Sequence, residues 1–85
     1  MGRFELLIRP SVAKDVQGIP QSDLRRILAR IESLRENPRP PGCVRLSASE
    51  CYRIRQGDYR IVYEIHDGRL VVIVVRVGNR RDVYR

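Results

Sequence analysis

The spacing of the hydrophobic residues changes once along this chain, and that change constrains the fold more than any other feature. Between Leu24 and Leu34 the apolar residues recur at the i, i+3, i+4, i+7 spacing of one helix face. After Gly42 they alternate with polar residues, which is the period of a half-buried strand. The segment between the two patterns, 37–42, contains three prolines and cannot continue a helix. The sequence therefore predicts helices followed by strands, as in an α+β domain.

Three elements are predicted before that boundary. Apolar and polar residues alternate over 4–8, which indicates a first strand that stops at Pro10. A short helix is predicted over 11–17, with Gly18 available to cap its end. A longer amphipathic helix, with a proline in its first turn, is predicted from Asp23 to near Asn37. Its apolar face comprises Leu24, Ile27, Leu28, Ile31 and Leu34.

Three strands are predicted after the boundary, over 52–55, 59–65 and 70–75. Gly57-Asp58 and Asp67-Gly68 are the turn signals between them. The third strand is a continuous apolar run, and such strands are usually central and covered on both faces. We therefore expect an antiparallel β-sheet meander with the two N-terminal helices packed on one face. Because 85 residues are enough for one core and too few for two, a single domain over 1–85 is expected.

The composition excludes several classes of protein. Two cysteines are too few for a disulfide framework, and one histidine without a Cys-x-x-Cys motif leaves a zinc site short of ligands. The longest apolar run has six residues, whereas a membrane helix needs about 20. We therefore expect no metal, no cofactor, no membrane association and a cytoplasmic location. A chain this short has little room for an enclosed cavity, so any chemistry is expected in an open cleft.

The charge of the chain points to a polyanionic partner. Seventeen basic residues against ten acidic ones give a formal net charge of +7, and all the basic residues except Lys14 are arginines. The planar guanidinium group binds phosphates through paired hydrogen bonds and stacks on bases, which a lysine ammonium cannot do. A nucleic acid is the partner that this composition favours.

The predicted hairpin brings arginines together. If Gly57 and Asp58 are the two turn residues, Arg55 lies directly opposite Arg60, and both share one face of the sheet with Arg53. Like charges placed opposite each other destabilise paired strands, and a bound anion would remove the repulsion. This pairing predicts a phosphate-binding face. The alternative interpretation is a solvated arginine-rich surface whose aliphatic stems cover apolar neighbours. The same register puts on the other, core-facing side Tyr52, Ile54, Ile61 and Tyr63.

The tail after Val77 continues the basic pattern, with three arginines and Tyr84 within residues 78–85. A tyrosine beside arginines can stack on an unpaired RNA base. The structural alternative is that Tyr84 anchors the terminus on the sheet. We interpret the remaining aromatic residues as core or rim residues and His66 as facing solvent. The arginines of the longer helix form a solvated face or a docking face for an acidic partner or ribosomal RNA.

Two motifs resemble those of a known family. They are Tyr52-Arg-Ile-Arg-Gln-Gly-Asp-Tyr-Arg-Ile-Val-Tyr63 and, after one further strand, Val77-Gly-Asn-Arg-Arg-Asp-Val-Tyr84. Together with the strand and two helices before them, they resemble the RelE family within the RelE/ParE superfamily of prokaryotic toxins. The resemblance implies a RelE-like fold of the microbial ribonuclease type. It also implies a ribosome-dependent endoribonuclease that cuts messenger RNA in the A site without a metal, using the RNA 2′-hydroxyl as nucleophile.

The resemblance also implies the site residues. The catalytic positions would be Arg55, Arg60, Arg80 and Tyr84. Further contacts to RNA would come from Arg45, Arg53 and Arg81. Arginine does not act as a base in proteins, so the general base stays open between Glu50, Glu64, His66, Tyr84 and a mechanism of positioning and electrostatics alone.

Partners follow from the same resemblance. The family implies the ribosome and messenger RNA as targets, and a cognate antitoxin that covers the basic face and binds operator DNA, to which the toxin is linked only indirectly. Two alternatives remain on this scaffold. One is a ParE-like inhibitor of DNA gyrase, and the other is a non-catalytic nucleic-acid-binding module.

Overall fold

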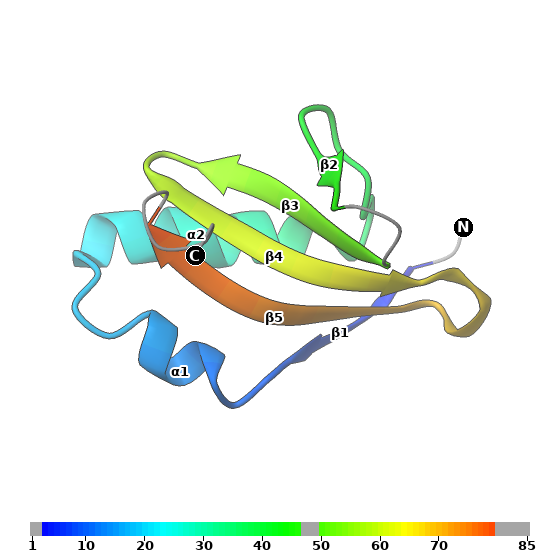
Figure 1. The fold of residues 1–85 in the computed structure, drawn as a ribbon, viewed down its shortest axis with the longest axis horizontal. Helices are drawn as coiled ribbons and strands as arrows, with labels where there is room; N and C mark the ends of the chain where they lie inside the picture. The colour runs from blue at the N-terminus through cyan, green and yellow to red at the C-terminus, as the bar shows by residue number, and fades with distance from the viewer. Residues whose placement is uncertain (1–2, 47–49, 80–85) are drawn as a thin grey trace.

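The computed structural model describes residues 3–46 and 50–79, and Figure 1 shows their arrangement. The elements are β1 (Glu5–Ile8), α1 (Val12–Asp15), α2 (Gln21–Ser33), β2 (Val44–Arg45), β3 (Cys51–Gln56), β4 (Tyr59–His66), a 3₁₀ turn η1 (Asp67–Arg69) and β5 (Val71–Asn79). The predicted α+β class is confirmed. Strand β2 was not predicted, because a two-residue strand has no measurable alternation.

The five strands form one sheet in the order β1-β5-β4-β3-β2. Strands β3, β4 and β5 make the predicted antiparallel meander, and β2 adds a further antiparallel partner to β3. Strand β1, however, pairs with β5 in parallel, so the sheet is mixed rather than wholly antiparallel. Parallel pairing requires a long crossover, and here the whole segment from α1 to β4 separates the two partners in sequence.

Both helices pack on the same face of the sheet. Their buried residues join the inward side chains of β3, β4 and β5 in one hydrophobic core. Helix α2 ends at Ser33 rather than near Asn37, and α1 spans only four residues. Leu28 departs from the predicted apolar face, because its side chain is 48% exposed. No helix within the described residues is long and apolar enough to cross a membrane.

Strand β5 lies inside the sheet, between β1 and β4, as its apolar run predicts. Its second face is not covered, in contrast to the prediction. Val72, Val74 and Val77 are buried in the core, whereas Val71 and Ile73 on the other face are only half-buried. No helix among the described residues lies over that side, which we call the outer face. An open sheet face is therefore available to a ligand.

A β-bulge changes which side chains of β5 reach the outer face. Val62 pairs with Arg76, but the next residue of β4, Tyr63, pairs with Val74. Val75 is the extra residue of the bulge. Because of this single insertion, Val77 faces the core and Arg76 faces outward.

The loop after α2 is attached to the sheet through aromatic and ionic contacts. The hydroxyl of Tyr63, whose pKa is raised by burial, donates a hydrogen bond of 2.6 Å to the carbonyl oxygen of Pro38. Tyr52 stacks on Tyr63 with ring centroids 6.1 Å apart, and the guanidinium of Arg39 lies 5.1 Å from the Tyr52 ring centroid. Arg39 also donates to both carboxylate oxygens of Asp67, at 3.0 and 2.8 Å. These contacts join the loop, β3 and η1.

The ion pair of this loop predicts a pH dependence of stability. The two hydrogen bonds from Arg39 lower the pKa of Asp67 below its ordinary value. A carboxylate whose pKa is lower in the folded state than in the unfolded state stabilises the fold. The contribution is complete at pH values above the unfolded-state pKa of about 4, and it is lost as the pH falls through the folded-state pKa. Asp67→Asn is therefore expected to lower Tm at pH 7, and the difference from the wild type should shrink below about pH 4.

Thermal melts between pH 2 and 7 would measure the difference. In an Arg39→Gln background, Asp67→Asn should change Tm little, because the partner is already gone. A gap in Tm that stays constant down to pH 2 would contradict this assignment.

Candidate nucleic-acid interface

The hairpin between β3 and β4 has the register predicted from its turn. Gly57 adopts a φ of +62°, which favours glycine, while Asp58 does not have a positive φ. This combination fits a two-residue type II′ turn. Arg55 pairs directly with Arg60, as predicted. The other predicted pairs are also confirmed: Gln56 with Tyr59, Ile54 with Ile61, Arg53 with Val62 and Tyr52 with Tyr63.

Three of the predicted site residues share the outer face. Cross-strand partners share a face and residues two apart on a strand do too, so Arg53, Arg55 and Arg60 lie on one side of the sheet. Arg55 is exposed and Arg53 is half-buried, whereas Arg60 is buried, with 7% of its surface exposed. Arg55 and Arg60 line one hollow of about 30 Å³ beside the turn. The other lining residues of the hollow are Gly57, Asp58 and Tyr59.

Like charges at directly paired positions of two strands repel each other, and a bound anion reduces that repulsion. The Arg55–Arg60 pair therefore gives this face a preference for a negatively charged group. A phosphate oxygen is the ligand that a guanidinium fork fits best. The arrangement is electrostatic, since neither arginine can take up a proton.

The Arg55–Arg60 repulsion predicts that one substitution will raise stability. Arg55→Gln is expected to raise the free energy of unfolding by about 0.5 kcal/mol in low-salt buffer, because it removes one of two like charges on paired strands. Added inorganic phosphate should stabilise the wild type more than the variant, since the anion binds the folded pair. Urea unfolding with and without phosphate would measure both effects.

Arg55→Lys is the matched control, because it keeps the charge and should not show the gain. An Arg55→Gln variant that is less stable than the wild type, or equally stabilised by phosphate, would show that the pair is not strained in this way.

A fourth arginine of the outer face was not predicted. Arg76 of β5 pairs with Val62, which pairs in turn with Arg53, so the two arginines lie in one row across three strands. Simple alternation along β5 would have placed Arg76 on the core face and Val77 on the outer face. The bulge at Val75 reverses them, and no residue of the sequence marks its position.

The opposite end of the outer face carries an acidic cluster. His66 Nε2 lies 2.9 Å from Glu64 Oε1, and His66 Nδ1 lies 3.6 Å from Glu50 Oε1. Arg9 donates to the second oxygen of Glu64 at 3.2 Å. His66 is therefore held between two carboxylates and is half-buried, rather than facing solvent as predicted. Within residues 3–46 and 50–79, no three side chains of the metal-ligating types form a group that could hold a metal ion.

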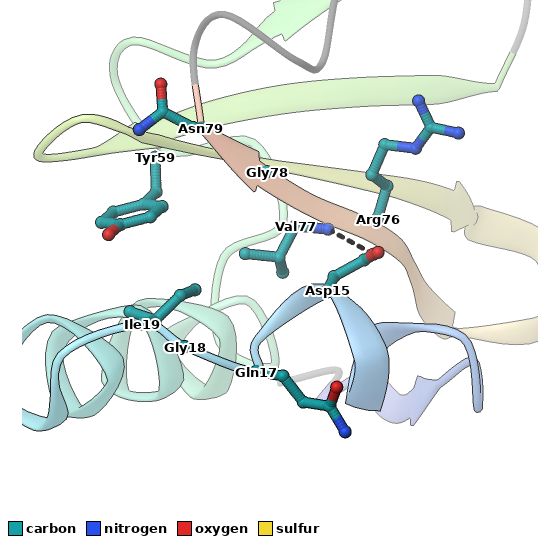
Figure 2. A pocket seen from close by; sticks show the side chains of 9 residues that line it. All are labelled: Asp15, Gln17, Gly18, Ile19, Tyr59, Arg76, Val77, Gly78 and Asn79. Atoms are coloured by element: carbon teal, nitrogen blue, oxygen red, sulfur yellow. Dashed lines mark hydrogen bonds between the residues drawn. The ribbon is translucent and has the colours of Figure 1, made fainter.

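A pocket of about 430 Å³ opens beside the end of β5 (Figure 2). The ring of Tyr59 and the side chain of Ile19 point toward each other across it, and the carboxylate of Asp15 accepts a hydrogen bond of 3.1 Å from the amide of Val77. Arg76 projects away from the helices at the rim. The hydrogen bond between Val77 and Asp15 joins the end of β5 to the last residue of α1. The pocket is lined by Asp15, Gln17, Gly18, Ile19, Tyr59, Arg76, Val77, Gly78 and Asn79.

The structure does not place the remaining predicted site residues on the outer face. Arg45 pairs with Tyr52, whose side chain is on the core-facing side, so the register places Arg45 on the face opposite Arg53. Arg80, Arg81 and Tyr84 lie outside the residues that the structure describes.

Comparisons with known proteins match two kinds of toxin, ParE and RelE. The family model for the ParE toxin of the type II toxin–antitoxin system parDE matches residues 6–84. A candidate RelE toxin of Methanocaldococcus jannaschii is 31% identical over 87 residues, which cover 98% of this chain and 97% of the relative. The RelE chain of the archaeal RelE–RelB complex of Pyrococcus horikoshii superposes with a TM-score of 0.83 at 26% identity, covering 98% of this chain and all of that one. The isolated RelE toxin of Escherichia coli gives 0.76 at 25% identity, covering 95% and 90%.

Proposed function

This chain belongs to the RelE/ParE superfamily of toxins from type II toxin–antitoxin systems, and on that premise we propose that it is a ribosome-dependent endoribonuclease that cuts messenger RNA in the A site. The coarser function, toxin of a RelBE-type system, follows from the family and the relatives. The observation that carries the finer proposal is the Arg55–Arg60 pair on an open sheet face. A polyanion whose phosphate enters this recess would relieve the repulsion between the two arginines.

The proposed reaction is an internal transesterification of RNA. The 2′-hydroxyl oxygen attacks the adjacent phosphorus atom, and the bond from phosphorus to the 5′-oxygen of the next nucleotide breaks. The products are a 2′,3′-cyclic phosphate and a free 5′-hydroxyl; the 2′-hydroxyl loses a proton and the leaving 5′-oxygen gains one. Negative charge builds up on the phosphoryl oxygens on the way, and fixed guanidinium groups stabilise it without reorganising.

The residues divide into proposed roles by position. Arg55 and Arg60 bind the phosphoryl oxygens, and only 7% of the surface of Arg60 is exposed. By their place in the second motif, Arg80 assists the leaving 5′-oxygen and Tyr84 stacks on a neighbouring base. Supporting contacts to RNA are assigned to Arg53 and Arg81. Arg45, which the register places on the opposite face of the sheet, is left out of the proposed site.

The acidic cluster does not suit the role of general base. Glu64 lies four residues from Arg60 on the same strand, which is about 13 Å at the rise of a β-strand. A base must approach within about 3 Å of the proton that it removes. Both carboxylate oxygens of Glu64 also contact other side chains, Arg9 and His66, so we do not assign this cluster as the base. This leaves Tyr84, or positioning and electrostatics alone, as the source of catalysis.

The proposed partners follow from the family. The relative from Pyrococcus horikoshii was solved with RelB, and we propose that an antitoxin likewise covers the basic outer face of this toxin. Binding to operator DNA would then be indirect, through that antitoxin. We also propose that residues 1–85 form one toxin domain that acts in the cytoplasm without a metal or cofactor.

Primer extension on messenger RNA tests the proposal. Purified toxin should cut a message on translating ribosomes and leave the same message intact when ribosomes are absent. The family model that matches this chain is named for ParE, so an assay for DNA gyrase cleavage complexes belongs beside it. Intact messenger together with accumulating gyrase complexes would replace the nuclease proposal with gyrase inhibition.

A further inference from the structure

We propose that Arg76 and Arg53 form a second phosphate subsite, which holds the messenger phosphate next to the one cut between Arg55 and Arg60. This inference rests on the proposed function, because it assigns a substrate contact to the same face. It adds Arg76, a residue that neither motif implies, and it gives that residue a role different from those of Arg55 and Arg60.

The sheet register defines two parallel rows of side chains. The first row runs across β3, β4 and β5 through Arg55, Arg60 and Gly78. The second row contains Arg53, Val62 and Arg76. On each strand it lies two residues further from the Gly57-Asp58 turn than the first row. Residues on the two rows share the outer face because the shift is two residues.

The spacing of the rows suits a single strand of RNA. Two residues along a β-strand span about 7 Å. This is comparable to the separation of successive phosphates in an extended polynucleotide. A phosphate held in the first row therefore leaves its neighbour over the second, where Arg53 and Arg76 flank the almost fully buried side chain of Val62.

The exposure and surroundings of Arg76 suit a phosphate-binding role. Its side chain is exposed and points away from Asp15 and the helices (Figure 2). Within residues 3–46 and 50–79 no carboxylate pairs with it, whereas Arg9 and Arg39 are each paired with an acidic residue. Arg76 therefore offers a guanidinium that the described residues do not neutralise.

The bulge at Val75 is what makes this placement possible. If β4 and β5 kept the register of their other half, Ile61 would lie opposite Arg76, and the arginine would point into the hydrophobic core. Burying an unpaired guanidinium there would be strongly unfavourable. The extra residue instead sends Arg76 outward and Val77 inward. Bulges that redirect side chains in this way are common beside active sites.

Substitutions in the second row should change KM, whereas substitutions in the first row should change kcat. The neighbouring phosphate does not react, so its contact has the same strength in the ground state and in the transition state. Such uniform binding lowers KM without raising kcat. Arg60, by contrast, binds the reacting phosphate and should act on kcat. A merely structural role of Arg76 would not produce this separation.

Cleavage kinetics on programmed ribosomes test the subsite. Arg76→Gln is expected to raise the half-saturating ribosome concentration about tenfold, which is typical for one lost charge-assisted contact, with kcat within about twofold of the wild type. Arg69→Gln is the matched control, because Arg69 is also exposed but lies at the other end of β5, in η1. Identical kinetics of the Arg76 and Arg69 variants, or a fall in kcat alone for Arg76→Gln, would overturn the inference.

A binding measurement separates this inference from the proposed function. In fluorescence anisotropy with a labelled single-stranded RNA oligonucleotide, Arg76→Gln should reduce the slope of log K against log salt by about 0.7, the value for one phosphate contact. Arg69→Gln should leave the slope unchanged. If the wild type cuts nothing on ribosomes, the nuclease proposal fails while the slope still decides the subsite. Equal slopes for the wild type and Arg76→Gln, or no binding by the wild type, would reject the subsite.

Discussion

Replacing Arg60 with glutamine is expected to slow the cleavage of ribosome-bound messenger RNA by about 100- to 1000-fold. The estimate is the usual cost of removing one preorganised donor to a developing negative charge. Arg60 is 7% exposed and lies opposite Arg55, so its guanidinium is held in a water-poor position where such a contact is strong. The loss should appear in kcat, because the contact strengthens as the reaction proceeds. Single-turnover cleavage on programmed ribosomes measures it.

The controls for this prediction separate chemistry from folding. Arg60→Lys keeps the charge but not the planar fork and should recover only part of the rate. Arg69→Gln removes an exposed arginine far from the hairpin and should cleave normally. Circular dichroism and thermal melts should show that Arg60→Gln is folded. A folded Arg60→Gln protein that cuts at the wild-type rate would refute the assignment of this arginine to the scissile phosphate.

Replacing Tyr63 with alanine is expected to destabilise the fold by about 3–5 kcal/mol, the usual cost of truncating a fully buried aromatic residue. Tyr63 has no exposed surface, stacks on Tyr52 and donates to the buried Pro38 carbonyl. The substitution removes the largest fully buried side chain of the described residues, and with it the hydrogen bond to the loop after α2. Urea unfolding monitored by circular dichroism measures the change.

Tyr63→Phe separates the two contributions. It keeps the ring and removes only the hydroxyl, and it should cost about 1–2 kcal/mol because the buried Pro38 carbonyl loses its partner. Equal losses for Tyr63→Phe and Tyr63→Ala would show that the hydrogen bond, and not the packing of the ring, accounts for the stability. A loss below about 1 kcal/mol for Tyr63→Ala would contradict the assigned core.

The parts of the site that depend on local rules could be predicted from the sequence. A two-residue Gly-Asp turn fixes hairpin register, so the position of Arg55 opposite Arg60 followed from the turn alone. The core face of α2 followed from its 3.6-residue period, with the exception of Leu28, which lies at the margin of the apolar stripe and is not covered by the sheet.

The parts that depend on distant contacts could not be predicted in the same way. Pairing of β1 with β5 joins segments more than 60 residues apart, and nothing in either strand specifies a parallel partner. The bulge at Val75 lies in an unbroken apolar run, so the outward position of Arg76 carried no local signal. The uncovered outer face of β5 could not be predicted either, since an apolar strand sequence does not show whether a helix covers both of its faces.

The central claim is that the outer face holds a messenger strand while its own 2′-hydroxyl breaks it. Cleavage of a programmed message that carries a single 2′-deoxy nucleotide at the mapped cut site tests this claim most directly. The toxin is expected to cut the all-ribose message, leaving a 2′,3′-cyclic phosphate, and to leave the 2′-deoxy message intact at that position. Undiminished cutting of the 2′-deoxy message, or no cutting of the all-ribose message, would contradict it.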